Sequence, residues 1–117
     1  MIRNGCVFEW ETVPEGLLVK VRGEIDHHGA ISLRRGVDAL IWERAPQMLI
    51  LDMSGITLMD SSGLGFIMGR YKLMNECGGE LKVQNPSACV LRILRVSGFE
   101  RRIEVVHTEA KEKRKES

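Results

Sequence analysis

The sequence predicts a single small α/β domain, with about five strands in a mixed sheet and three helices in the order β-β-α-β-α-β-α-β. The chain has 117 residues, which is a usual size for one domain. Its content of 44% hydrophobic and 28% charged residues is that of a globular protein. Short apolar runs alternate with segments of helical periodicity, an order typical of parallel strands joined by crossover helices.

The first half of the chain begins with an expected hairpin over residues 6–23. Its two β-prone runs are separated by a turn that contains Gly16, a residue that tolerates positive φ. Residues 30–44 repeat apolar side chains at intervals of three and four, which predicts a helix that ends before Pro46. Residues 48–51 are continuously apolar, as expected of a strand covered on both faces.

The second half continues the alternation of helices and strands. The expected elements are a helix from about Ser61 to Cys77, a strand at 80–83, a helix that opens at 85–87 and ends at Gly98, and a strand at 103–106. From Thr108 onward nearly every residue is polar or charged and cannot contribute to a core. We therefore expect one domain over residues 1–107 and a disordered tail over 108–117.

Composition excludes several functional classes. Seventeen basic and 16 acidic residues give a net charge of +1. Proteins that bind nucleic acids ordinarily carry a clear excess of positive charge, which this chain does not have. No apolar run approaches the roughly 18 residues of a membrane-spanning helix, and the N-terminus is too charged for a signal peptide. Three cysteines without CxxC spacing fit reduced thiols. We expect a cytoplasmic protein that contacts neither nucleic acid nor membrane.

The most unusual segment, residues 53–65, connects a predicted strand to a predicted helix. Connections of this kind commonly carry functional residues in α/β proteins. Asp60, Ser61 and Ser62 are all favourable at a helix N-cap, and capping alone accounts for one of them. A cap needs only one such residue, and here two adjacent serines follow the aspartate and precede Gly63. The second interpretation is therefore that the serines have a functional role.

The helix after these serines has an unusual surface. Five apolar residues are expected to form its buried stripe: Leu64, Ile67, Met68, Tyr71 and Met74. Five others are expected on the opposite side: Ser62, Gly65, Phe66, Gly69 and Leu73. A surface helix ordinarily carries charges there and avoids glycine. This side therefore either packs against another helix of the domain or serves as a docking surface for another protein.

A phosphoryl group on Ser61 or Ser62 would act as a switch at this surface. It adds a charge of about −1.5 to −2, which a helix N-terminus tolerates. Against a closely docked partner it would add bulk and an uncompensated charge, and Asp60 would add like-charge repulsion. A penalty of about 3 kcal/mol would weaken binding about a hundredfold.

Residues 49–73, LILDMSGITLMDSSGLGFIMGRYKL, resemble the signature of anti-sigma factor antagonists with the STAS fold, and are most similar to its sporulation members. The segment GEIDHH at 23–28 resembles an upstream turn of the same family. The resemblance extends from about Val7 to Val106. It implies a STAS domain without enzymatic activity that, when unphosphorylated, binds an anti-sigma factor and so releases a sigma factor of RNA polymerase.

The resemblance also implies the partners and the site residues. The anti-sigma factor would also be a serine kinase that uses ATP to phosphorylate Ser61, and a serine phosphatase would reverse this step. Asp26 would lie near Ser61 and contact the partner. The expected partner-binding residues are Asp26, Asp60, Ser61, Ser62, Gly63, Gly65, Phe66, Gly69 and Leu73. Catalytic residues, metal ligands and cofactors are not expected.

The main alternative is a small nucleotide-binding α/β protein. Gly63, Gly65 and Gly69 are similar to the glycines of a phosphate-binding loop. The dinucleotide fingerprint, however, places its first glycine directly after a strand and uses a shorter overall spacing. About ten residues separate the predicted strand at 48–51 from Gly63, so the match is weak.

Two further alternatives involve the histidines. A serine hydrolase would combine Ser61 or Ser62 with His27 or His28 and with Asp26 or Asp60, but the GxSxG elbow is missing. A metal site at His27 and His28 would need a third ligand at a suitable spacing, and adjacent residues of an extended segment point to opposite faces. Both functions are therefore disfavoured.

Overall fold

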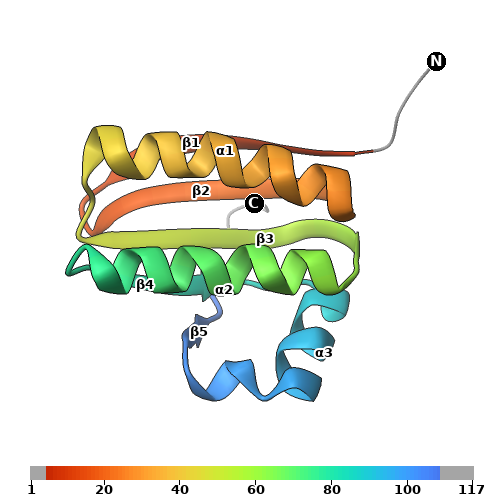
Figure 1. Cartoon of the computed structure of the whole chain (residues 1–117). Coiled ribbons are helices and arrows are strands. Elements are labelled where there is room, and N and C mark those ends of the chain that lie inside the picture. The colour runs from red at the N-terminus through yellow and green to blue at the C-terminus, as the bar shows by residue number, and fades with distance from the viewer. Residues whose placement is uncertain (1–4, 109–117) are drawn as a thin grey trace, which may run out of the picture.

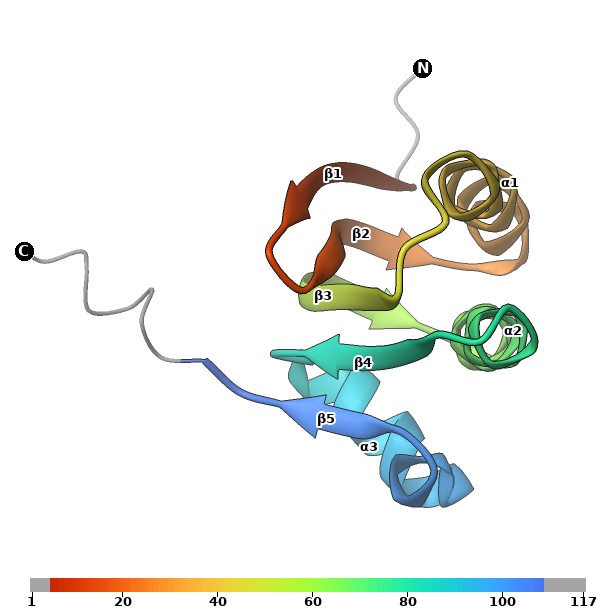
Figure 2. The same ribbon diagram turned by 90° about the vertical axis from the view of Figure 1, so that its left-hand side faces the viewer.

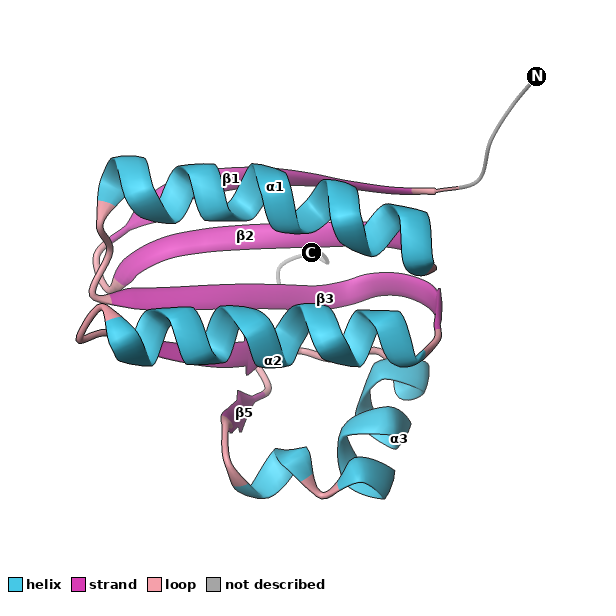
Figure 3. Ribbon diagram, viewed as in Figure 1, coloured by secondary structure: helices cyan, strands magenta, loops and turns pink. Residues whose placement is uncertain are grey.

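The computed structural model describes residues 5–108 and confirms the predicted element order (Figure 1). The elements are β1 (Cys6–Val13), β2 (Gly16–Ile25), α1 (His27–Arg44), β3 (Met48–Met59), α2 (Ser61–Glu76), β4 (Glu80–Gln84), α3 (Ala88–Ser97), the 3-10 helix η1 (Phe99–Arg101) and β5 (Glu104–Val106). Loops between most of them are short (Figure 3). Apart from Thr108, the expected tail lies outside the described residues.

The five strands form one mixed sheet in the order β1-β2-β3-β4-β5. β1 and β2 pair antiparallel as the predicted hairpin, and each later neighbour pairs parallel. Seen end-on, α1 and α2 lie side by side against one face of the sheet, and α3 lies below β4 (Figure 2). The opposite face is covered by no helix of residues 5–108. The helices α1 and α2 therefore create one layer over a single sheet face.

The core lies between the sheet and these two helices. Val19, Leu51 and Val83 are consecutive partners across β2, β3 and β4, and each is completely buried. From α1, the side chains that pack on the sheet are Leu33, Val37, Leu40 and Ile41. Burial of each such side chain contributes about 1.5–3 kcal/mol, which holds α1 and α2 firmly on the sheet.

β3 is longer than the sequence predicts. The expected strand ends at Leu51, whereas the observed strand continues to Met59. Its second half pairs with β2 beyond two register irregularities, so that Ile25 lies opposite Met59. These irregularities interrupt the alternation of apolar and polar side chains from which a strand is predicted. The longer strand brings the beginnings of α1 and α2 together at the same edge of the sheet.

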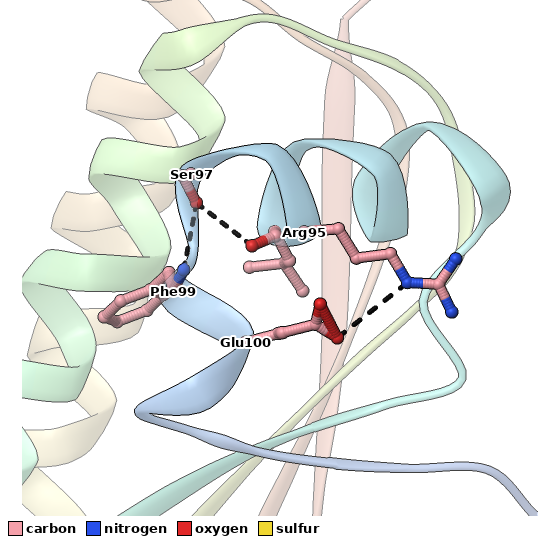
Figure 4. A network of polar contacts seen from close by, with 5 residues as sticks. Arg95, Ser97, Phe99 and Glu100 are labelled. Carbon is pink, nitrogen blue, oxygen red and sulfur yellow. Dashed lines mark hydrogen bonds and ion pairs between the residues drawn. The ribbon is translucent and has the colours of Figure 1, made fainter.

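The end of α3 is fastened to α2 through η1, a short helix that the sequence did not predict. Gly98 adopts a left-handed conformation with φ of 79° and ends α3. The Ser97 hydroxyl donates to the Leu94 carbonyl at 3.1 Å and accepts from the Phe99 N–H at 3.2 Å (Figure 4). The buried ring of Phe99 meets Tyr71 of α2 edge-on, with 5.4 Å between ring centroids. This contact packs η1 against α2 on the side of α2 that faces away from α1.

Candidate functional site

Two aspartates place the helices α1 and α2 next to each other. Asp26 accepts a 2.8 Å hydrogen bond from the Gly29 N–H, and Asp60 accepts one of the same length from the Ser62 N–H. Both are therefore helix N-caps. The N–H of Asp60 donates to the carbonyl of Ile25 at 3.3 Å, so the two caps are neighbours. The structure thus brings Asp26 close to the segment that contains the serines.

Asp26 is a charged group at this edge. The hydrogen bond from the Gly29 N–H lowers the pKa of Asp26 below its ordinary value. The side chain is exposed, and it therefore presents a carboxylate to the solvent at neutral pH. Asp60 is exposed as well, one residue before Ser61. The edge where α1 and α2 begin consequently displays two acidic side chains.

Ser61 and Ser62 occupy different environments. Ser61 is the first residue of α2 and is exposed, and its hydroxyl forms no hydrogen bond with any residue between 5 and 108. Ser62 is half-buried, and it lines a groove between α1 and α2. Of the two serines, Ser61 is thus the more accessible to solvent.

The structure corrects the predicted orientation of α2. Phe66 was expected on the outward side, but it is only 3% exposed, whereas Met68 was expected in the core and is 44% exposed. The reason is that α2 packs against α1 as well as against the sheet. The buried arc therefore extends toward α1 and includes Phe66, and the outward arc shifts onto Met68.

The three glycines near the start of α2 also differ. A methyl group added to Gly65 or Gly69 would meet no atom within 4 Å outside its own helix, so both positions are open. The same group on Gly63 would lie 2.2 Å from Cγ of Met59. The prediction that Gly65 and Gly69 lie outside the core is confirmed. Gly63 is instead a position of close packing and is buried.

The accessible surface of α2 is a ridge, which we call the α2 ridge. It consists of Ser61, Gly65, Met68, Gly69 and Lys72. Gly63 and Phe66, two of the predicted partner-binding residues, are buried, and Leu73 is half-buried against the core. The exposure of Met68 was missed, because it depends on the packing of α1 against α2, which periodicity within one helix does not reveal.

Grooves lie on both sides of the ridge. The α1–α2 groove has a volume of about 330 Å³ and is lined by His27, Ala30, Ile31, Arg34, Ser62, Gly65, Phe66, Gly69 and Arg70. The second groove, between α2 and the segment around η1, has a volume of about 640 Å³ and is lined by Leu64, Met68, Tyr71, Lys72, Asn75, Ser97, Gly98, Phe99 and Arg102. The ridge therefore stands between two depressions.

Arg70, one of the residues that line the α1–α2 groove, forms an ion pair with α1. Nε of Arg70 lies 2.8 Å from Oδ1 of Asp38 on α1, and the Arg70 side chain is 7% exposed. Burial lowers the pKa of Arg70, Asp38 raises it, and the nearby charge of Arg34 lowers it further. A buried charge of this kind is tolerated only when it is paired. Asp38 and Arg70 thus tie α2 to α1.

The geometry does not support the alternative functions. Gly63, Gly65 and Gly69 all lie within α2, so they do not form a loop that could surround a phosphate. Over residues 5–108, neither Ser61 nor Ser62 is hydrogen-bonded to a histidine, and the two aspartates are engaged as caps. The same part of the chain contains no group of three side chains suited to hold a metal ion. None of its helices is both long and apolar enough to cross a membrane.

Comparisons with known proteins agree with this geometry. A model of the STAS domain matches residues 8–112. The anti-sigma F factor antagonist of Paenibacillus polymyxa is 42% identical over 83 residues, which cover 71% of each chain. SpoIIAA in its unphosphorylated form has a TM-score of 0.76 and 26% identity over 91% of each chain. Bacillus SpoIIAA in the phosphorylated form has a TM-score of 0.69 and 26% identity over 92% of this chain and 98% of its own.

The sequence motif, the fold and these matches lead to the same assignment. The alternation of strands and helices, the capped start of α2 and the serine pair all lie inside the matched region. The chain belongs to the STAS-domain family, among its anti-sigma factor antagonists.

Proposed function

We propose that this protein is an anti-anti-sigma factor whose unphosphorylated form binds an anti-sigma factor that is also a serine kinase. Binding releases a sigma factor, and phosphorylation of Ser61 ends it. The observation that carries this proposal is the position of Ser61, exposed at the first residue of α2 and at the end of the α2 ridge. A modification there changes the rim of the surface without disturbing the core.

The α2 ridge supports close contact with a partner. Gly65 and Gly69 have open space where a side chain would stand, so the backbone of another protein can approach α2 closely. Met68 supplies apolar area next to them, with 44% of its surface exposed. A docked partner would remove water from this surface, and a phosphoryl group on Ser61 would then be desolvated without a counter-charge. Binding and phosphorylation would therefore exclude each other.

The two SpoIIAA structures support a switch that acts at the surface. Both the unphosphorylated and the phosphorylated form are similar in fold to this chain. A phosphoryl group at a helix N-terminus is favoured by the helix dipole and the free N–H groups. We therefore propose that phosphorylation of Ser61 leaves the domain folded and changes only what it binds.

The same proposal covers the rest of the cycle. A serine phosphatase restores the active form, and the domain itself catalyses no reaction. Its site of action is the cytoplasm, where a sigma factor meets RNA polymerase. Asp26 and Asp60, exposed beside Ser61, are the acidic contacts at the edge of the interface.

The test compares Ser61→Ala, Ser61→Asp and the matched control Ser62→Ala in binding to the anti-sigma factor kinase of the same genome. Ser61→Ala should bind like the wild type but resist inactivation by the kinase and ATP. Ser61→Asp should bind about a hundredfold more weakly. Ser62→Ala should bind and still be phosphorylated. Equal binding by all variants, or phosphate found by mass spectrometry in Ser61→Ala, would contradict the role of Ser61.

A further inference from the structure

We infer that the α1–α2 groove receives a carboxylate side chain of the anti-sigma factor, and that Arg34 is the residue that pairs with it. The inference rests on the proposed function, because it specifies the chemistry of the partner at the surface next to Ser61. It concerns a different element, α1, and a residue that none of the predicted contacts includes.

The charges of the groove do not balance. Arg34 and Arg70 both line it, and the lining residues include no acidic side chain. Asp38 is paired with Arg70 at 2.8 Å. Arg34 is exposed and forms no ion pair with any residue from 5 to 108. One positive charge therefore remains at the mouth of the groove.

Other groups near the groove do not cancel this charge. The pKa of buried Arg70 is lowered partly by the charge of Arg34, which indicates that the two cations lie within electrostatic range of each other. His27, at the end of the groove, contributes no negative charge. Asp60, exposed just before α2, forms no ion pair with Arg34 or with any other residue from 5 to 108. An additional anion from outside would satisfy Arg34.

The shape of the groove admits a side chain from a protein docked on the α2 ridge. One wall is formed by Gly65 and Gly69, which have no side chains, and the other by Ala30 and Ile31 of α1. The volume of about 330 Å³ exceeds that of one acidic side chain. α1 and α2 lie side by side along their whole length (Figure 1). A carboxylate side chain of the partner that passes over Gly65 and Gly69 would therefore reach Arg34 directly.

A carboxylate is the complementary group for an arginine at such an interface. A guanidinium and a carboxylate can form two parallel charge-assisted hydrogen bonds. The pair would be partly desolvated by the docked partner, where charge complementarity contributes to both affinity and rate of association. The same negative charge in the partner would also be repelled by a phosphoryl group on Ser61. Pairing at Arg34 thus adds to the effect of the switch.

The experiment compares Arg34→Glu and Arg34→Lys with the matched control Arg35→Glu, using calorimetric titration with the anti-sigma factor kinase. Arg35 is the next residue of α1, is also exposed, and does not line the groove. Arg34→Glu should bind at least about tenfold more weakly. Arg34→Lys should lie between it and the wild type, because lysine keeps the charge but not the fork of donors. Arg35→Glu should stay within about twofold of the wild type.

The outcomes separate the inference from the proposed function. The inference is supported further if replacement of one acidic residue of the kinase by arginine restores binding to Arg34→Glu. It is overturned if Arg34→Glu binds like the wild type, or if Arg35→Glu is weakened equally, while Ser61→Asp still loses binding. If the wild type does not bind the kinase, or if Ser61→Asp binds as tightly as the wild type, the proposed function fails as well.

Discussion

The guanidinium of Arg70 lies over the ring of Phe66, with 5.4 Å between Cζ and the ring centroid. The two residues are one turn apart on α2, and Arg70 also reaches the carbonyl of Phe66 at 3.4 Å. Both side chains are buried where α2 meets α1. Phe66 is thus a core residue at the contact between α1 and α2, whereas Met68 is the exposed apolar side chain of the α2 ridge.

Replacement of Phe66 and of Met68 by alanine should therefore have opposite consequences. Phe66→Ala removes a buried ring and should lower the free energy of unfolding by about 3 kcal/mol. Met68→Ala removes an exposed side chain and should change stability by less than about 0.5 kcal/mol, yet weaken binding to the anti-sigma factor kinase. Urea denaturation and calorimetric titration on both variants measure these effects. A large loss of stability in Met68→Ala would contradict the assignment of the ridge.

Removal of the Asp38 charge should show how much an unpaired, buried Arg70 destabilises the fold. Asp38→Asn leaves the guanidinium without its counter-charge and should lower the free energy of unfolding by about 2 kcal/mol. The value is below that of a fully buried pair because the Asp38 side chain is 27% exposed.

The matched control for Asp38→Asn is the double variant Asp38→Leu with Arg70→Met, which removes both charges. It should recover most of the lost stability, since two apolar side chains replace a desolvated pair. Thermal and urea denaturation give the comparison. If the double variant is as unstable as Asp38→Asn alone, packing rather than charge dominates at this contact.

Substitutions at two glycines of α2 distinguish a role in partner docking from a role in packing within the domain. Gly69→Arg should fold, because no atom outside its own helix lies within 4 Å of the added Cβ, but it should block docking on the ridge. Gly63→Ala should lower the free energy of unfolding by about 2 kcal/mol, because its Cβ would overlap Met59. Circular dichroism and urea denaturation distinguish the two. An unfolded Gly69→Arg variant would show that this side of α2 serves packing within the domain.

Acidification should destabilise the protein through Asp52, a buried residue of β3. Burial raises the pKa of Asp52, but hydrogen bonds from Gln84 and Ser54 outweigh this effect and hold the pKa below its ordinary value. Because the pKa is lower in the folded than in the unfolded state, the carboxylate stabilises the fold at neutral pH. This contribution disappears as the pH falls below about 4, through the folded-state pKa.

The variant Asp52→Asn isolates this contribution. It should be less stable than the wild type at neutral pH, and the difference should shrink at about pH 3. Urea titrations at both pH values measure it. A constant difference between the two proteins at both pH values would show that the carboxylate charge is not responsible.

The element order could be predicted from the sequence because it depends on local patterns, and the candidate site was proposed from local patterns as well. Apolar periodicity marks the strands and helices, and the aspartate before Ser61 marks the start of α2. The unusual glycines at positions 65 and 69 were also informative, since glycine in a helix interior lowers stability unless it serves another purpose. These features need no knowledge of the tertiary structure.

The features that were missed depend on contacts between elements. For the side of α2 that carries Phe66, packing against another helix and docking of a partner remained two alternatives, and the structure shows that α1 covers Phe66. The end of β3 was missed because its register irregularities break the alternation. The charge of Arg34 at the groove becomes apparent only when Asp38 is seen to be paired with Arg70. Each of these facts follows from packing rather than from local sequence.

The helix-free face of the sheet provides an attachment site for a label. Glu9, Lys20 and Asp52 are consecutive partners across β1, β2 and β3, so acid and base alternate along the row. Lys20 lies between the buried Val19 and Val21, so the side chains of this row point away from the layer of α1 and α2. A fluorophore or a chip linker coupled to a cysteine introduced at Lys20, in a variant without the exposed Cys77 thiol, would report on complex formation in real time while leaving the helical side unobstructed.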